Sequence, residues 1–438
     1  MAIELDMGAA DFEQRFCALL GAKRESAADV DAAVADIIEE VRARGDDALA
    51  EFSLRFDRVN LRAKGFAIGP GEIDAAVAAC EPRALEALEF AHSRVTAYHE
   101  RQKPADLHFT DALGVELGWR WRPIAAVGLY VPGGAASYPS SVIMNAVPAK
   151  VAGCRRLAMV VPAPDGRINP LVLAAARIAG VDEIYRVGGA QAIAALAYGT
   201  QSIAPVAKVV GPGNAYVAAA KRRVFGVVGV DMIAGPSEVV ILADSSADPR
   251  FVAADLLAQA EHDETAQSIL ITDDADLARA AGAEAERQLA ALPREKIAGA
   301  SWRDYGAIIL CPTLDAALPL VERLAPEHLE IMTREPEALA AKIDNAGAIF
   351  LGSHTPEAIG DYVGGSNHVL PTGRSARFSS GLGVLDFLKR TSLLKCDAQS
   401  LATLGPAAVT LGKAEGLDAH ARSVALRLAA EPQPARRP

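Results

Sequence analysis

The apolar run Ile124-Ala-Ala-Val-Gly-Leu-Tyr-Val131 stops at the turn residues Pro132-Gly133-Gly134, which predicts a buried strand followed by a turn. A helix is expected next, over 140–152, with Ser140 or Ser141 as its N-cap. A second apolar strand is expected at 157–161. Strands that are separated by a helix of this length are typical of a parallel sheet, because the helix carries the chain back across the sheet.

The alternation of helix and strand continues in both directions along the chain. Helices are expected at 170–179, 190–197 and 215–224, with strands at 183–187 and 207–210. After Gly235-Pro236 the pattern starts again, with strands at 238–243, 268–272, 307–310, 328–332 and 348–351 and helices at 249–261, 275–292, 314–324 and 336–343. The fold class is therefore α/β, with two tandem Rossmann-like domains, each an incomplete, doubly wound parallel sheet.

Helical segments are expected on both sides of this α/β core. We predict an N-terminal helical segment over 1–128, a first Rossmann-like domain over 129–236, a second over 237–382 that part of 22–128 completes, and a helical tail over 383–438. The proline-rich end at 431–438 is predicted to be disordered. Ligands of open α/β sheets bind beyond the carboxyl ends of the strands, which draws attention to the loops at 130–138, 188–191, 211–214, 234–237 and 364–374.

The composition limits the classes of protein that the chain can belong to. Its 438 residues carry a net charge of −11, and an acidic surface disfavours nucleic acid and anionic membranes as partners. The N-terminus lacks the features of a signal peptide, and no run of about 18 apolar residues predicts a membrane span. The five cysteines are widely spaced, as expected for reduced thiols in the cytoplasm, so a metal site would use nitrogen and oxygen ligands.

Two polar residues near the end of the helix at 249–261 form a candidate metal site. Gln259 and His262 are three positions apart and therefore share a helix face. Imidazole is a common metal ligand, and the glutamine amide offers a hard oxygen. A polar helix end, in which His262 interacts with the helix dipole, explains the same pair and is favoured on this segment alone.

Three other segments carry polar groups that could take part in chemistry. The Gly211-Pro-Gly-Asn214 loop between a strand and a helix fits a phosphate site or a tight turn equally well. The adjacent Glu327 and His328 could transfer protons during a reaction, or they could be ordinary polar residues on the surface. Glu415 and His420 are expected at the start of the last amphipathic helix. Cys154 is expected to be a buried structural thiol.

An ordered set of motifs resembles the histidinol dehydrogenase family over nearly the whole chain. The motifs include Val210-Gly-Pro-Gly-Asn-Ala-Tyr-Val217, Gln259-Ala-Glu-His262, Ala325-Pro-Glu-His-Leu-Glu330 and Glu415-Gly-Leu-Asp-Ala-His420. Further matches lie at 127–134, 189–193, 231–238, 360–372, 378–382 and 389–391. Each motif alone is modest, but their order along one chain is specific.

The resemblance implies one zinc ion per subunit, held by Gln259, His262, Asp361 and His420. Four nitrogen and oxygen ligands suit zinc, and manganese or cobalt could replace it. In the family the substrate binds the same metal through its imidazole and amino groups, so the ion orients the substrate.

The resemblance also implies NAD-dependent oxidation of L-histidinol to L-histidine through L-histidinaldehyde, the last step of histidine biosynthesis. His328 and Glu327 match the family's acid–base pair. Substrate contacts are implied for Ser237, Gln259, His262, His328, Asp361, Glu415 and His420, and NAD contacts for Tyr130, Gln191 and Asn214, which places NAD on the domain at 129–236.

The family forms a homodimer in which the C-terminal region crosses to the partner, so Glu415 and His420 are implied to complete the other subunit's site. Three alternatives remain open at this point: a relative that oxidises another polar alcohol, such as a sulfonate diol, a zinc hydrolase with Glu327 as its base, and a non-catalytic metal-binding dimer.

Overall fold

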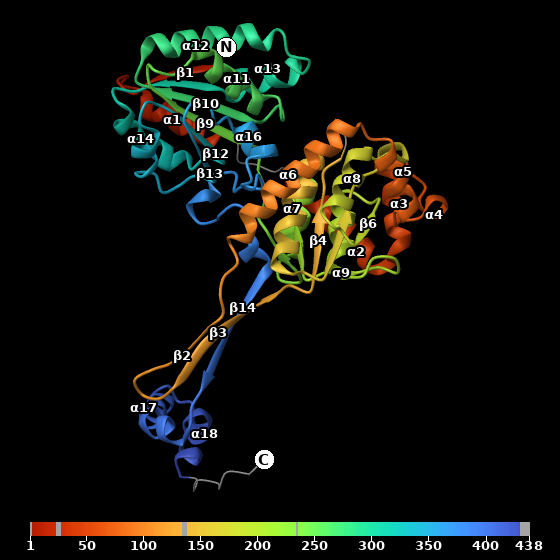
Figure 1. The fold of residues 1–438 in the computed structure, drawn as a ribbon, viewed down its shortest axis with the longest axis vertical. Helices are drawn as coiled ribbons and strands as arrows, with labels where there is room; N and C mark the ends of the chain where they lie inside the picture. The colour runs from red at the N-terminus through yellow and green to blue at the C-terminus, as the bar shows by residue number, and fades with distance from the viewer. Residues whose placement is uncertain (1, 23–27, 134–137, 234, 430–438) are drawn as a thin grey trace. The chain divides into compact units, whose positions relative to one another are not determined.

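The computed structural model describes residues 2–22, 28–133, 138–233 and 235–429, which form two compact units. The larger unit comprises Met1–Gln102 and Ile124–Phe387 and contains two parallel sheets (Figure 1). The strands of the first sheet are β4 (Ala126–Tyr130), β5 (Arg156–Val160), β6 (Glu183–Tyr185), β7 (Lys208–Val210) and β8 (Gly229–Val230). The strands of the second sheet are β1 (Ile3–Asp6), β9 (Glu238–Ala243), β10 (Gln267–Thr272), β11 (Ala307–Leu310), β12 (His328–Met332) and β13 (Ala348–Leu351).

The two sheets repeat one topology, which confirms the predicted tandem α/β fold. The first sheet has the order β6-β5-β4-β7-β8 and the second the order β1-β11-β10-β9-β12-β13. Apart from β1, both orders place the third, second, first, fourth and fifth strands of the repeat side by side, and every pairing is parallel. The strand β1 was not predicted, because a four-residue edge strand with alternating polarity gives a weak signal.

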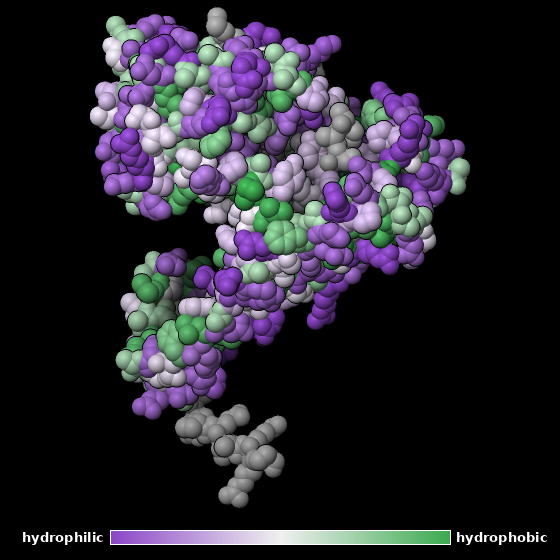
Figure 2. Space-filling model, turned by 45° about the horizontal axis from the view of Figure 1, so that its top comes forward, coloured by the Kyte–Doolittle hydropathy of each residue, from purple (hydrophilic) through white to green (hydrophobic). Residues whose placement is uncertain are grey.

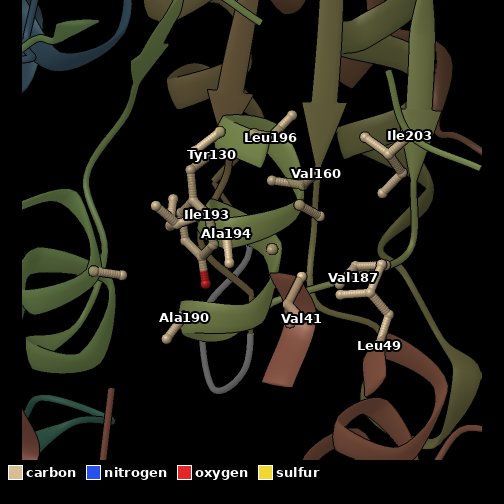
Figure 3. Packing of buried hydrophobic residues seen from close by; sticks show 14 of the residues in the cluster. Val41, Leu49, Tyr130, Val160, Val187, Ala190, Ile193, Ala194, Leu196 and Ile203 are labelled. Atoms are coloured by element: carbon tan, nitrogen blue, oxygen red, sulfur yellow. The ribbon is translucent and has the colours of Figure 1, made fainter. Parts of the chain in front are cut away.

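Helices cover the first sheet, and the core beneath them is rich in small apolar residues. The helices are α2 (Ala28–Arg44), α3 (Asp46–Asp57), α4 (Leu61–Lys64), α5 (Pro70–Ala78), α6 (Pro82–Glu100), α7 (Pro139–Ala152), α8 (Pro170–Ile178), α9 (Gly189–Tyr198) and α10 (Ala215–Val224). Val41 from α2 and Ile193 from α9 belong to the same buried cluster as Val160 of β5 (Figure 3). The helix α2 thus packs on the first sheet, whereas α1 (Phe12–Gly21) packs on the second, and the predicted domain bounds stay a prediction.

The second sheet carries α1 (Phe12–Gly21), α11 (Pro249–Ala260), α12 (Ala275–Leu289), α13 (Glu295–Tyr305), α14 (Leu314–Leu324), α15 (Pro336–Ala340) and α16 (Glu357–Tyr362). Two local predictions were wrong. The helix α7 begins at Pro139 with Tyr138 as its N-cap, so neither Ser140 nor Ser141 caps it, because proline suits the first helical position. The helix α13 was not predicted, and α12 ends before the turn that contains Pro293.

The smaller unit, Lys103–Pro123 with Leu388–Pro438, joins two segments that are far apart in sequence (Figure 1). It contains β2 (Leu107–Thr110), β3 (Glu116–Pro123) and β14 (Leu388–Lys395) in an antiparallel sheet with the order β14-β3-β2, followed by α17 (Ala398–Ala414) and α18 (Asp418–Leu428). The expectation of only helices and irregular chain after 383 was wrong for β14. Most residues of β14 are exposed, so it lacks the buried alternation that marks a strand.

The position of Glu415 also needs correction. Glu415 is the C-cap residue of α17, and only His420 lies on the last helix, α18. The residues 431–438, which were predicted to be disordered, lie outside the described part of the chain.

The face seen in Figure 2 mixes hydrophilic and hydrophobic residues. Among the described residues, no helix is both long and apolar enough to cross a membrane.

Candidate active site

The residues Glu327 and His328 lie at the amino end of the second sheet. His328 is the first residue of β12, Glu238 is the first residue of β9, and these two strands are neighbours. The described part of the 234–237 loop, residues 235–237, also precedes β9. The expectation that all ligand loops lie at carboxyl ends was therefore wrong here, since a loop–strand junction can present side chains at either end of a strand.

The backbone of Glu238 fixes the orientation of the His328 ring. The Nδ1 atom of His328 lies 3.1 Å from the Glu238 carbonyl oxygen. A carbonyl only accepts, so Nδ1 carries the proton and Nε2 keeps its lone pair. The Nε2 atom is buried and has no hydrogen-bond partner among the described residues. His328 thus offers an unoccupied basic nitrogen.

Three carboxylates surround this imidazole. His328 Nδ1 is 3.8 Å from Oε2 of Glu327 and 3.6 Å from Oε2 of Glu357, and Nε2 is 3.8 Å from Oδ1 of Asp361. Burial lowers the pKa of His328 to about 4, although the Asp361 carboxylate opposes part of this shift. His328 is therefore neutral near pH 7, as a general base must be.

The carboxyl of Glu357 is an acidic group that the sequence analysis did not single out. Burial, followed by the nearby carboxylates of Asp361, Glu330 and Glu327, raises the pKa of Glu357 well above its usual range. Glu357 precedes Asp361 by four residues on α16, so the two share one helix face. This four-residue spacing from Asp361 is the feature of the sequence that could have identified Glu357 as a candidate site residue.

Gln259 and His262 face the same region from the end of α11. The side chain of Gln259 is 0% exposed, and neither its Oε1 nor its Nε2 has a hydrogen-bond partner among the residues described. A buried amide without partners costs free energy, which a metal ion bound to Oε1 would offset. The potential ligand atoms of His262, Glu357 and Asp361 all lie within 4.8 Å of one another. The donor set fits a zinc-like cation.

A loop after α16 buttresses Asp361. His368 Nδ1 lies 3.0 Å from the backbone oxygen of Asp361, and His368 Nε2 lies 3.4 Å from Oγ of Ser141. Asn367 donates to the backbone oxygen of Met144 at 2.7 Å, while its Nδ2 lies 3.2 Å from Nε2 of the buried His99. Neither His99 nor His368 was singled out in the sequence, because their contacts with Asn367 and Ser141 join segments that are far apart along the chain.

Comparison with known proteins identifies the family. The histidinol dehydrogenase family model matches residues 21–428. The chain is 66% identical over 428 residues to a histidinol dehydrogenase of Bradyrhizobium diazoefficiens, with 98% of this chain and 99% of the relative covered. It is 67% identical over 428 residues to that of Nitrobacter winogradskyi, with coverage of 98% and 100%. The chain belongs to the histidinol dehydrogenase family. The structure of a family member from Elizabethkingia anophelis matches with a TM-score of 0.92 and 34% identity, covering 98% of each chain.

The residues for which the family resemblance implied NAD contacts follow strands of the first sheet. Tyr130 ends β4, and its buried hydroxyl accepts a hydrogen bond from the backbone N–H of Gly189 at 3.1 Å. Figure 3 shows this hydroxyl directed toward the start of α9, where Gln191 is also buried. Asn214 caps α10 by accepting from Tyr216 and Val217. A cavity of about 480 Å³ lies at the residues that follow β4 and β5 and is lined by Pro132, Gly133, Val161, Pro162, Arg167 and Asn169, among others.

The glycine loop beside Asn214 is held by buried charges. Gly211 N–H donates to Oδ2 of Asp231 at 2.7 Å, and Lys221 Nζ donates to the Gly211 oxygen at 3.0 Å. Lys221 and Asp231 also form a buried ion pair. Gly211 has a φ of +112°, and a Cβ there would collide with the backbone oxygen of Tyr130. Only glycine fits, so the loop geometry is strictly specified.

The remaining predicted residues of this family member divide between the two units. His262, Glu327, His328 and Asp361 come together in the larger unit, where Gln259 lies on α11 and Ser237 directly precedes β9. Glu415 and His420 belong to the smaller unit, where both are exposed. Cys154 is buried, as expected, and burial raises the pKa of its thiol to about 11, which disfavours a nucleophilic role.

Proposed function

We propose that this chain is a histidinol dehydrogenase that oxidises L-histidinol to L-histidine through L-histidinaldehyde, the last step of histidine biosynthesis. The reaction consumes two NAD⁺ and one water for each histidinol. The observation that carries the proposal is the buried, neutral imidazole of His328, whose Nε2 has no hydrogen-bond partner in the described part of the chain and lies beside Asp361 in a member of the histidinol dehydrogenase family.

The zinc site would use Gln259, His262 and Asp361 of one subunit with His420 of the partner subunit. Support comes from the buried amide of Gln259, which has no hydrogen-bond partner within the ranges that the structure describes, and from the close approach of the His262 and Asp361 side chains. Manganese or cobalt suits the same donors. When bound, the ion supplies a Lewis acid that holds the imidazole and amino groups of the substrate.

His328 acts as the general base for the alcohol. Its Nδ1 proton is committed to the Glu238 carbonyl, so Nε2 accepts the hydroxyl proton while hydride leaves the adjacent carbon. The low pKa that burial gives His328 keeps this nitrogen unprotonated at neutral pH. Proton removal and hydride loss then convert the alcohol to the aldehyde.

Glu327 is the base for the second oxidation. Its Oε2 accepts a hydrogen bond from the Glu238 N–H at 3.1 Å, which orients the carboxylate. Glu327 takes a proton from the water that adds to the aldehyde carbonyl, and the hydrate then loses the second hydride as the acid forms. Glu327 and His328 are adjacent where β12 begins, so one can serve the alcohol oxidation and the other the aldehyde oxidation while the substrate stays in place.

Substrate and cofactor contacts complete the proposal. Ser237 and Glu415 contact histidinol, while Tyr130, Gln191 and Asn214 contact NAD near the cavity beyond β4 and β5. We place Glu415 and His420 in the partner's site within a homodimer. The exposed apolar side chains of Leu411, Leu417 and Leu426 in the smaller unit support association through this region, and Figure 2 shows hydrophobic residues on it.

The deciding experiment is an assay of NADH formation with L-histidinol, together with metal analysis. We expect about two NADH per histidine, loss of turnover when a chelator removes the metal, and recovery with zinc. Turnover of another polar alcohol such as a sulfonate diol, with none of histidinol, would overturn the substrate. Chelator-sensitive hydrolysis in the absence of NAD would overturn the reaction class.

A further inference from the structure

The short loop at residues 235–237, which leads into β9, is tied to a distant part of the chain. The backbone N–H of Gly235 donates a hydrogen bond of 2.5 Å to Oγ1 of Thr372. Thr372 is 6% exposed and is the last residue of a continuous buried stretch, 369–372. A hydroxyl in a closely packed stretch cannot move with the loop, so it is a fixed attachment point for the Gly235 backbone.

The stretch that carries Thr372 is anchored at both ends. At one end, Nδ2 of Asn367 donates to the Met144 oxygen at 2.7 Å, and Oδ1 of Asn367 accepts from the Val369 N–H at 2.9 Å. At the other end, the Thr372 carbonyl oxygen accepts from the N–H and Oγ of Ser375, at 3.1 and 2.7 Å. The Thr372 hydroxyl is therefore held in place independently of the loop.

A cavity borders the loop, so packing alone does not fix where the loop lies. Its volume is about 200 Å³, and its lining includes Gly235, Pro236, Val240, Ile269 and Leu324. The last three belong to the buried cluster that includes residues of α1 and α14. Leu329 belongs to the same cluster, so the preceding residue, His328, points to the opposite face of the sheet. The loop thus has a cavity on one face of the sheet and the candidate base on the other.

Ser237 is the last residue of the loop, and the proposed function assigns it to histidinol. Its carbonyl oxygen accepts from the Gln267 N–H at 3.0 Å, where the pairing of β9 with β10 begins. This bond holds the end of the loop that enters the strand. The other end depends on the bond from Gly235 to Thr372. A shift of that end into the cavity would draw Ser237 away from the face that carries His328.

We propose that Thr372 is a positioning residue for histidinol, whose hydroxyl keeps the loop out of the cavity and thereby keeps Ser237 at the substrate. In this role Thr372 acts through the Gly235 backbone and contacts neither the substrate nor the metal. The inference rests on the proposed function, because the assignment of Ser237 to histidinol is what gives the loop its task. It extends the site to a residue that lies 137 positions beyond Gly235.

The test compares Thr372→Val with Thr372→Ser in the histidinol assay. Valine keeps the shape of threonine but removes the acceptor, so a fraction of the molecules has a displaced loop and the apparent affinity falls accordingly. We expect the KM for histidinol to rise about five- to tenfold, as for the loss of one hydrogen bond, with kcat within about twofold of wild type. Serine keeps the hydroxyl, so its KM should stay within about twofold of wild type.

The expected difference between KM and kcat has a structural reason. Glu238 holds both candidate bases through its backbone, and it belongs to β9, which pairs with β10 and β12. A displaced loop therefore leaves the bases in place. A general loss of structure would lower kcat as well.

Thr272→Val is a matched control, because it makes the same change at another buried threonine. Oγ1 of Thr272 accepts from the Asp274 N–H at 3.1 Å, at the carboxyl end of β10 and thus at the far end of the sheet from the loop. The control should lower the thermal unfolding midpoint and leave the KM for histidinol unchanged. If Thr372→Val does not fold, Thr372→Ala removes the same acceptor, and we expect the same rise in KM.

Hydrogen exchange of the Gly235 amide measures the bond in the absence of substrate. We expect exchange to be at least about threefold faster in Thr372→Val than in wild type, and unchanged in Thr272→Val. Equal exchange in wild type and Thr372→Val would overturn the inference. An unchanged KM in Thr372→Val, or an equal rise of KM in Thr272→Val, would also overturn it.

Failure of the proposed function is distinguishable from failure of this inference. The proposed function fails in the wild-type protein, as absence of histidinol turnover, and the substrate role of the loop is then refuted with it. The inference alone fails when an active wild type and its Thr372→Val variant have the same KM for histidinol.

Discussion

The Nδ1 atom of His328 lies 3.1 Å from the carbonyl oxygen of Glu238, and the two residues begin neighbouring parallel strands. The same Glu238 peptide region also supplies an N–H, at 3.1 Å, to the Glu327 carboxylate. One strand end thus sets both the tautomer of the imidazole and the direction of the carboxylate. The groups that hold the two side chains are the backbone C=O and N–H of Glu238, which a substitution of His328 or Glu327 does not remove. Each base can therefore be replaced while the groups that oriented it stay in place.

Replacing His328 should abolish most turnover and leave the metal in place. In His328→Asn the side-chain amide can still donate to the Glu238 carbonyl, but no basic nitrogen remains. We expect kcat for NADH formation to fall by about 10²- to 10⁴-fold, with zinc content unchanged. His328→Gln is a matched variant that reaches toward the Nε2 position instead. Turnover within threefold of wild type in both variants would contradict the assigned base.

Gln259→Leu should move metal affinity and the stability of the metal-free protein in opposite directions. The leucine removes two buried polar atoms that lack partners among the described residues, so we expect the metal-free protein to gain about 1–2 kcal/mol in free energy of unfolding. The zinc affinity should fall sharply. Gln267→Leu is the control, because the buried Gln267 amide already donates to the Tyr305 oxygen, and its loss should destabilise. Calorimetry of both metal-free variants measures whether the free energy of unfolding rises or falls relative to wild type.

Lys221→Met should loosen the glycine loop of the proposed NAD site. The change leaves the Asp231 carboxylate buried without its ion-pair partner, and we expect a loss of about 3–5 kcal/mol in the free energy of unfolding. The Gly211 carbonyl also loses its donor, so the KM for NAD should rise more than the KM for histidinol. Arg222→Met, at an exposed neighbouring position, is the control. Equal unfolding midpoints in the two variants would show that the Lys221–Asp231 ion pair does not stabilise the Gly211 loop.

The stability of the metal-free protein should depend on pH through Asp255. Its raised pKa, about 6 against an ordinary 3.8, means that the folded state binds more protons between these values. Stability therefore falls as pH rises from about 4 to 6, by roughly 1–3 kcal/mol for this group. Asp255→Asn should flatten that slope. Glu330 of β12 and Glu357 of α16 face the same region, so their ionisation adds to the wild-type slope at higher pH.

Subunit mixing should test the shared site. Inactive His328→Asn and His420→Ala proteins, mixed under conditions in which exchange of subunits is verified, should regain part of the wild-type turnover. One of the two sites in a mixed dimer would then contain an intact His328 with an intact His420 of the partner subunit. Absence of any recovery would contradict the exchange of the C-terminal region.

The periodic parts of the fold were predictable, and the exceptions have physical reasons. The run at 124–131 predicted β4 within two residues, because a strand buried on both faces is apolar throughout. The strand β14 escaped prediction because it pairs in an exposed ribbon, where no alternation of burial is required. The edge strand β1 is short and joins β11 about 300 residues later, which no local pattern can encode.

The candidate site was predictable through motifs, and much less so through spacing. Gln259 and His262 alone were best explained as a polar helix end. Their significance appears only where the chain returns with Asp361 and Glu357, more than 90 positions later. Glu357 and His368 were missed because each has partners on other elements, and local polarity does not distinguish such a residue from a surface one.

The pairing of β1 with β11 sets an order of events during synthesis. The first sheet uses strands between residues 126 and 230, so its hydrogen bonds can form as soon as this segment leaves the ribosome. The second sheet cannot acquire its outer edge until residue 310 has emerged, and Ile3 then pairs with Ala307. Until that moment β1, which is made first, has no partner strand, and a chaperone or a second nascent chain could bind its unpaired backbone groups. The first strand to be made therefore waits until residue 307 for its neighbour, and β12 and β13 complete the opposite side of the sheet later still.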